Sequence, residues 1–230
     1  MLNDIVYIIK NGPSTDEIKY SIRSVVENFP YNSIWIYGGK PKGIRPDHYV
    51  EYVQHGETRY AKVTNTIREI CKNEEITPDF WLFNDDFFIL QKVDDFPTLH
   101  QGTLYERVEK IRARRGAYSG YSLKLKATAD VLRRNGYEQI DYALHCPILI
   151  NRAKALETIE KFSDYPMFRS LYGNHHSIGG VRADDYKIQN TDDVPAQGAL
   201  FVSTSDRAYR IGKAGEYVRR TFSKPSQYEV

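Results

Sequence analysis

The feature of this sequence that most constrains its fold is the alternation of short apolar runs with helical patterns over the first 90 residues. Apolar runs bounded by turn residues predict four strands, at Asp4–Ile9, Ser33–Tyr37, Tyr49–Val53 and Phe80–Phe83. Two helices are predicted between them, one from a cap at Ser14, Thr15 or Asp16 to about Asn28, and one over Tyr60–Lys72. Strands that alternate with helices pair in parallel, with helices on both faces of the sheet. The pattern therefore predicts an α/β fold with a mostly parallel sheet.

The second half of the chain continues this pattern with wider spacing. An apolar stretch predicts a strand at Ala143–Ile150, interrupted by His145-Cys146-Pro147, and Arg152–Phe162 is a predicted helix. A last strand is expected at Ala199–Ser203, followed by a helical segment over Asp206–Phe222. The 230 residues, 41% of them hydrophobic, are enough for one substantial core. We expect a single domain over residues 1–230.

Charge and cysteine content exclude several classes of protein. Lys and Arg number 32 against 30 Asp and Glu, a net charge of +2, which excludes a highly charged disordered chain and a polyanion binder that works by bulk charge. No apolar run approaches the roughly 20 residues that span a bilayer. Cys71 and Cys146 are too few for a disulfide framework, and we expect two reduced thiols. With no signal-peptide features at the N-terminus, these observations favour a cytoplasmic location.

One segment departs from the balanced charge of the whole. Residues Leu104–Tyr137 hold nine Lys and Arg against three acids, a local net charge of +6, with tyrosines interleaved. This composition predicts a basic helical excursion from the α/β domain. Such a surface suits an anionic or glycan acceptor, which includes a polysaccharide, teichoic acid, a nucleic acid or a lipid phosphate. The alternative is a solvated helical surface without a partner.

Two adjacent carboxylates follow the most apolar predicted strand. Asp85 and Asp86 come directly after Phe80–Phe83 and Asn84. Two neighbouring carboxylates repel each other, and burial without a counter-ion is costly. Mg²⁺ and Mn²⁺ prefer oxygen ligands and commonly join one or two carboxylates to substrate phosphates. We therefore predict a divalent metal at Asp85 and Asp86, against the alternative of a solvated turn.

Polar turns also follow the other predicted strands of the first half. Because the carboxyl ends of parallel strands meet at one edge of a sheet, Asn11-Gly12 and Tyr37-Gly38 should lie near the carboxylates. We expect both turns to contact a nucleotide, together with Lys62 and Asn65 on one face of the following helix. The alternatives are ordinary turns and a solvated helix surface. No phosphate-loop or GxGxxG spacing is present, which disfavours a P-loop enzyme and a dinucleotide-dependent oxidoreductase.

Three further residues are candidates for chemistry. His145 is a candidate general base for an acceptor hydroxyl, and Asp185 is the favoured member of the later acidic pairs because it follows a His- and Gly-rich loop. His175, in that loop, is a candidate metal ligand beside Asp85 and Asp86. Asp86 is also counted among the catalytic candidates through its predicted metal. A structural role is the alternative for each.

Four stretches of the chain resemble a known family. DIVYIIKNG (4–12), EIKYSIRSVVENFP (17–30), FNDDFF (83–88) and LHCP (144–147) are similar to segments of the Stealth family of bacterial sugar-phosphate transferases. More broadly, the chain looks like a nucleotide-sugar transferase of the GT-A type, whose fold is Rossmann-like. The opening stretch has Ile9-Lys10 where the family has a Trp before Asn-Gly. The resemblance implies a divalent metal at Asp85 and Asp86, a nucleotide-activated donor and a base at His145.

From the residues and the resemblance together we expect a metal-dependent glycosyltransferase. It would use Mn²⁺ or Mg²⁺ and move a sugar from a nucleotide-sugar donor, a UDP-sugar, to an acceptor hydroxyl. Residues of about 1–90 would bind the donor and residues of about 91–230 the acceptor. Two alternatives stay open, Stealth-type transfer of a hexose-1-phosphate and a non-catalytic module that binds carbohydrate or nucleic acid. The expected location is cytoplasmic, which includes the surface of a membrane and the host cell of a phage.

Overall fold

The computed structural model describes residues 2–12 and 16–230. Its central sheet contains β1 (Asp4–Ile9), β2 (Ile34–Gly38), β3 (His48–Glu51), β4 (Asp79–Asn84) and β7 (Ile148–Asn151). The smaller strands are β5 (Phe87–Ile89), β6 (Leu99–His100), β8 (Val181–Arg182), β9 (Lys187–Ile188) and β10 (Phe201–Thr204). The helices are α1 (Glu17–Asn28), α2 (Arg59–Lys72), α3 (Leu104–Arg115), α4 (Gly120–Arg134), α5 (Arg152–Lys161), α6 (Phe168–His175), α7 (Asp206–Ile211) and α8 (Lys213–Thr221).

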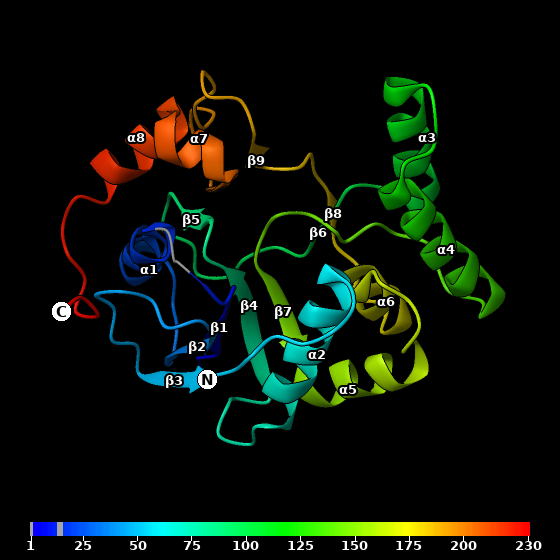
Figure 1. The fold of residues 1–230 in the computed structure, drawn as a ribbon, viewed down its shortest axis with the longest axis horizontal. Coiled ribbons are helices and arrows are strands. Elements are labelled where there is room, and N and C mark those ends of the chain that lie inside the picture. Colours follow the sequence, from blue (N-terminus) through cyan, green and yellow to red (C-terminus); the bar gives the residue numbers. More distant parts are fainter. Residues whose placement is uncertain (1, 13–15) are drawn as a thin grey trace.

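The central sheet has the strand order β3-β2-β1-β4-β7. The first four of these strands are parallel, and β7 pairs antiparallel to β4 at the edge. The order reverses beside β1, because the chain first moves outward through β2 and β3 and then returns to β4 on the other side of β1 (Figure 1). In open α/β sheets, ligands bind outside the carboxyl ends of the strands at such a reversal.

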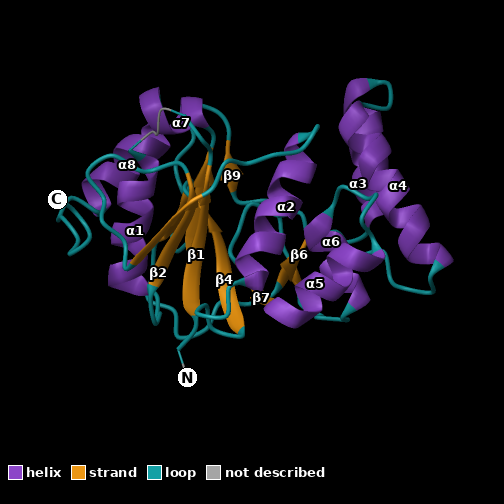
Figure 2. Ribbon diagram, turned by 60° about the horizontal axis from the view of Figure 1, so that its bottom comes forward, coloured by secondary structure: helices purple, strands orange, loops and turns teal. Residues whose placement is uncertain are grey.

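Alternate residues of the strands face two different layers of helices. On one face, Ile5 and Tyr7 pack with Ile22 of α1 in one buried cluster. On the other face, Val6 packs in a second cluster with residues of α2, α5 and α6. Figure 2 shows α1 on one side of the strands and these three helices on the other. The predicted fold, a mostly parallel sheet with helices on both faces, is confirmed.

Two further small sheets extend this core. Strand β10 pairs antiparallel with β5 and parallel with β9, and it carries α7 and α8. Strands β6 and β8 form a separate parallel pair. The short β5 follows β4 after a turn of only two residues, Asp85 and Asp86. The carboxylate pair therefore lies in the turn that connects the central sheet to the three-stranded sheet of β5, β10 and β9.

The basic segment forms a helical hairpin of α3 and α4, as predicted. Helix α3 begins with a capping box of Thr103 and Glu106 and ends at Gly116, whose φ of 72° is the left-handed conformation that glycine favours. Buried leucines and valines of both helices form one cluster with Phe162 and with Leu171 of α6. The hairpin is thus anchored to the α5–α6 layer and lies at one edge of the molecule (Figures 1 and 2).

The structure differs from the predicted elements at three places. Strand β7 begins at Ile148 rather than at Ala143, because Pro147 has no N–H for a ladder and the carbonyls before it bond to Arg169. The C-terminal helical segment is two helices separated by Gly212. The predicted caps Ser14 and Thr15 lie outside the described residues, and the side chain of the N-cap residue Asp16 makes no capping hydrogen bond.

The two cysteines are free and buried, as predicted. In the part of the chain that the structure describes, no helix has both the length and the apolar character that crossing a bilayer requires.

Candidate functional site

The carboxyl ends of β1, β2 and β4 meet at one edge of the central sheet. Ile9 lies beside Gly38, and Ile8 lies beside Asn84 in the parallel registers. The polar turns that follow these strands are therefore neighbours, as the alternation of strands and helices indicates. Three groups of side chains lie at this edge: the carboxylate pair, a histidine–aspartate pair and a set of polar groups around Asn11.

Asp86 is held on the small sheet by two donors. One carboxylate oxygen accepts a hydrogen bond from the Lys187 ammonium of β9 at 2.8 Å and another from the Ser203 hydroxyl of β10 at 2.8 Å. The Asp86 residue is only 9% exposed. Both donors bond the same oxygen, and within residues 2–12 and 16–230 no hydrogen bond is made to the other.

Asp85 has an unfavourable environment for a negative charge. Burial is the main cause, and the neighbouring Asp86 carboxylate adds to it, so that the pKa of Asp85 is raised from 3.8 to about 6. Asp206 at the start of α7 raises this pKa further, while Lys187 lowers it. Asp85 thus interacts with two other carboxylates and one ammonium group, and an additional cation beside it would be favourable.

We expect Asp85→Asn to stabilise the protein at neutral pH. The folded state binds a proton on Asp85 more readily than the unfolded chain, so the stability contributed by this group is lost as pH rises from about 4 to about 6. The cost above this range is at most about 3 kcal/mol. Urea unfolding should show the variant more stable than wild type by about 1–3 kcal/mol at pH 8, with little difference at about pH 4. Asp94→Asn, an exposed carboxylate, is the matched control and should change neither value. An equal effect at both pH values would contradict this account of Asp85.

The carboxylate pair fits a divalent cation that shares its oxygen ligands with a phosphate. Oxygen ligands from one or two carboxylates, completed by substrate phosphates and water, are the usual environment of Mg²⁺ in such sites. Within residues 2–12 and 16–230, no three His, Cys, Asp or Glu side chains form a group that could hold a metal. If a cation binds here, Asp85 and Asp86 would supply two ligands, and water and the bound molecule would complete the shell.

His145 and Asp185 form the second group. The His145 Nδ1 lies 2.9 Å and 3.1 Å from the two carboxylate oxygens of Asp185, and the His145 amide donates to the same carboxylate at 3.2 Å. Burial would raise the pKa of Asp185, but the hydrogen bonds from His145 outweigh it and the pKa is lowered. The His145 side chain is 40% exposed. Among the described residues the His145 Nε2 has no hydrogen-bond partner, and Asp185 orients the ring from the Nδ1 side.

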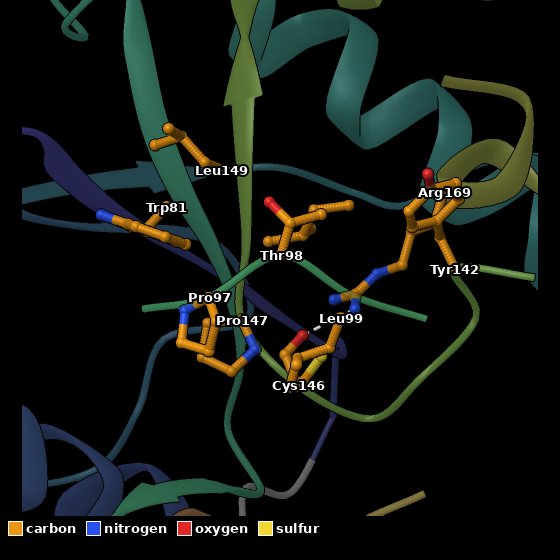
Figure 3. A pocket seen from close by; sticks show the side chains of 10 residues that line it. Trp81, Pro97, Thr98, Leu99, Tyr142, Cys146, Pro147, Leu149 and Arg169 are labelled. Atoms are coloured by element: carbon orange, nitrogen blue, oxygen red, sulfur yellow. Dashed lines mark hydrogen bonds between the residues drawn. The ribbon is translucent and has the colours of Figure 1, made fainter. Parts of the chain in front are cut away.

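Arg169 of α6 connects the two groups. Its guanidinium donates to the carbonyls of Leu144 and Cys146, on either side of His145, at 2.8 Å and 2.6 Å. Figure 3 shows this side chain beside a small cavity, reaching toward Cys146. Burial lowers the pKa of Arg169, and the nearby carboxylates of Asp86 and Asp185 act in the opposite direction. Arg169 thus fixes the turn that carries His145 and lies within electrostatic reach of both acids.

The third group surrounds Asn11 at the end of β1. The Asn11 side chain donates to the carbonyl of Tyr52 at 3.0 Å and accepts from the amide of Gln54 at 3.0 Å. Asn65 of α2 donates to the carbonyl of His55 at 3.1 Å, and His55 lies against the Tyr52 ring. The segment after β3 therefore connects Asn11 with Asn65. Lys62 is exposed one helical turn before Asn65, and Gly12 has open space around it.

Two predicted site residues, Tyr37 and His175, are elsewhere than expected, and Gly38 lies at the strand edge with a structural role. The Tyr37 ring is buried under α2, with its hydroxyl bonded to Asn73, so it cannot stack on a base. Gly38 has a φ of +115°, and a Cβ there would lie 2.0 Å from the Ile9 carbonyl oxygen, so this glycine serves the close approach of β1 and β2. His175 faces α5, 3.3 Å from the Thr158 hydroxyl and 3.5 Å from Glu157, and does not join the carboxylate pair.

Sequence reasoning missed four residues of the site. None of the four lies in a motif. The pairing of β9 with β10 brings Lys187 and Ser203 to the strand edge, and the position of α6 brings Arg169. Tyr52 follows β3 and is bonded through its carbonyl to Asn11. Ser203 was a member of the predicted last strand, and alternation along that strand could have indicated which of its polar residues points inward.

An open groove of about 510 Å³ lies at the base of the α3–α4 hairpin. His100, Glu106, Glu138 and Arg182 line it together with residues at the base of α3. Ala183 donates its amide to the His100 carbonyl, and Asp185 follows two residues later. The segment that lines the groove at Arg182 thus continues along the chain to Asp185 of the His145–Asp185 pair. The polar lining of the groove suits a hydroxyl-rich ligand.

The fold and the carboxylate-bearing strand edge place the chain in a structural class, that of mixed α/β domains with a GT-A-like sheet. No protein-family model matches the sequence, and no curated protein matches it. Solved structures do match. A galactosyltransferase, LgtC, in complex with donor and acceptor sugar analogues aligns with 97% of this chain and 96% of its own, at 10% identity and a TM-score of 0.51.

A second structure of LgtC, with an active-site substitution, aligns over the same shares of both chains at 11% identity and a TM-score of 0.50. The apo form of the glycosyltransferase GlyE of Streptococcus pneumoniae aligns with 97% of this chain and 61% of its own, at 11% identity and a TM-score of 0.46. The likeness to LgtC shows the GT-A-like fold. The narrower resemblance to the Stealth family is not confirmed.

Proposed function

We propose that this protein is a glycosyltransferase that moves a sugar from a nucleoside diphosphate donor, a UDP-sugar, to an acceptor hydroxyl with the help of Mn²⁺ or Mg²⁺. The observation that carries the proposal is the Asp85–Asp86 pair, half-buried at Asp85 and buried at Asp86, at the carboxyl end of the central strand β4 in a domain with a GT-A-like fold. The LgtC structure of the same fold contains donor and acceptor sugar analogues. We extend the binding of a donor and an acceptor to the present chain and assign it to the strand edge.

In this proposal the donor lies across the strand edge. Asp85 and Asp86 would hold the divalent ion, which, when bound, stabilises the charge that develops on the leaving diphosphate. Lys187 is close enough to Asp86 to contact the same phosphates. Asn11, Gly12 and Asn65 surround the nucleoside, and Tyr52 replaces the buried Tyr37 as the ring available to a base.

The acceptor approaches from the other side of the carboxylate pair. The free Nε2 of His145 takes the proton of the attacking hydroxyl, and Asp185 keeps the ring oriented and stabilises its protonated form. The groove between His100 and Glu138 would receive the remainder of the acceptor. The sequence predicts the donor on residues of about 1–90 and the acceptor on residues of about 91–230, and the proposal adds Lys187 of the second part to the donor side.

The experiment that tests this function is a thermal-shift screen of nucleotide sugars with Mn²⁺ and with EDTA. Binding to the folded state raises the melting temperature, and even a weak ligand registers when its concentration is well above Kd. We expect stabilisation by a UDP-sugar only with the metal, followed by release of UDP when an acceptor is supplied. Release of UMP would instead favour transfer of a sugar-1-phosphate. Metal-independent binding with no turnover would favour a non-catalytic binding module.

A further inference from the structure

The tip of the α3–α4 hairpin has a chemistry that the proposed transfer reaction does not use. Around the turn between the helices, Arg112, Arg114 and Arg115 are exposed together with Tyr118 and Leu123. Tyr118 is 47% exposed and Leu123 is 54% exposed. Two large side chains with apolar surface thus stand in water among three arginines. This set of five residues is called the hairpin tip below.

Of the three arginines of the tip, Arg112 is paired with a carboxylate of its own helix, and in the described part of the chain Arg114 and Arg115 are not. The three acids of the hairpin are paired: Glu109 with Arg112 at 3.1 Å, Asp130 with Lys126 at 2.8 Å, and Glu106 with Arg182 at 3.4 Å. Among the residues that the structure describes, Arg114 and Arg115 have no carboxylate partner. The positive charge therefore increases toward the tip.

The shape of the hairpin selects the kind of partner. The tip is the convex end of a helical pair at the edge of the molecule (Figures 1 and 2). Single-stranded nucleic acids and similar polymers are bound along grooves in which successive units stack on aromatic rings. A flat anionic surface requires no groove. Aromatic side chains and basic residues that flank an apolar one are the composition of segments that rest at the interface of a bilayer.

The rigid base of the hairpin makes such docking effective. Leu104 and Leu125 are fully buried in the cluster that also contains Leu171 of α6. Contact at the tip therefore orients the whole domain. Arg112 also lies over the Tyr118 ring, 5.4 Å from its centroid, which holds the ring beside the charged group.

We infer that the hairpin tip docks on an anionic lipid bilayer, with the arginines at the phosphate headgroups and with Leu123 and Tyr118 among them. Each basic residue near such a surface strengthens attachment by about fivefold at low salt, so that two arginines account for about 25-fold. The attachment is peripheral and reversible, and salt weakens it.

The test is cosedimentation of the full chain with vesicles, without donor, metal or acceptor. We expect binding to vesicles of phosphatidylcholine mixed with phosphatidylglycerol, and none to phosphatidylcholine alone. Arg114→Glu with Arg115→Glu should weaken binding at least about 20-fold. Leu123→Ser with Tyr118→Ser should remove the part of the binding that survives high salt. Lys42→Glu with Arg45→Glu, the same change of charge on exposed residues of the loop between β2 and β3, is the matched control and should leave binding unchanged.

Three results would overturn the inference. The first is equal loss in the control and in the arginine pair, which would show bulk charge without a local site. The second is retention of the protein on duplex DNA with no binding to either vesicle, which would assign the tip to a polymer. The third is no binding to either. Circular dichroism of each variant establishes that it is folded. Because nothing in this test requires transfer activity, it can fail while the proposed function holds.

Discussion

Asp86→Asn is expected to abolish metal-dependent binding of UDP. The substitution keeps a side chain of the same shape beside Lys187 and Ser203, and it removes the charge that a divalent ion requires. We expect the affinity for UDP in Mn²⁺ to fall at least about 100-fold, which corresponds to about 2.7 kcal/mol. Isothermal titration calorimetry with Mn²⁺ and with EDTA measures the difference. Asp184→Asn, which neutralises an exposed carboxylate near the site, should leave the affinity unchanged.

Asn is the informative replacement at this position, because Asp86→Ala would also leave the Lys187 ammonium half-buried without its partner and weaken the fold. An unchanged UDP affinity in Asp86→Asn would mean that Asp86 holds no metal. The companion variant Lys187→Met then distinguishes two roles of the lysine. If Lys187 competes with the ion for Asp86, Mn²⁺ binds the variant more tightly in the absence of UDP. If Lys187 itself holds the diphosphate, the affinity of the variant for UDP in Mn²⁺ falls.

His145→Gln is expected to lower the rate of transfer by about 10²- to 10⁴-fold, the contribution typical of a general base. The donor should bind the variant as it binds wild type, because His145 contacts Asp185 and no residue of the nucleoside side. Asp185→Asn should give a loss in the same direction, since it removes the charge that stabilises the protonated ring. The measurement is kcat for UDP release, together with the calorimetric Kd for UDP.

The matched control for this pair is His176→Gln, a histidine of similar exposure beside α5 and away from Asp185. Equal losses in His176→Gln and His145→Gln would show that the effect is one of stability. A transfer rate in His145→Gln close to that of wild type would exclude His145 as the base.

The fold of the first 90 residues could be predicted because its signals are local. Apolar runs that stop at glycine, asparagine and proline delimit β1, β2 and β4, and the spacing of Ile18, Ile22 and Val25 gives the buried face of α1. The direction of β7 and the pairing of β10 with both β5 and β9 could not, because these contacts join segments more than 60 residues apart or depend on the path of the whole chain.

The residues of the candidate site could likewise be predicted only in part. Residue type and position along the chain identify four candidates, which are Asp85, Asp86, His145 and Asp185. The contact between His145 and Asp185 is visible only in the folded chain. Tyr37 was assigned to the wrong environment, since the sequence does not say which face of β2 lies under α2. His175 was wrong as a neighbour of the carboxylates because α6 turns it toward α5.

The two bonds from Arg169 to the carbonyls on either side of His145 have a consequence for any redesign of this protein. The loop that presents the imidazole takes its shape from a side chain on a helix that begins 21 residues later. If residues 144–147 were transplanted into another protein, they would therefore lose their geometry unless α6 were transplanted as well. Libraries that aim to change the choice of acceptor should vary the two segments together.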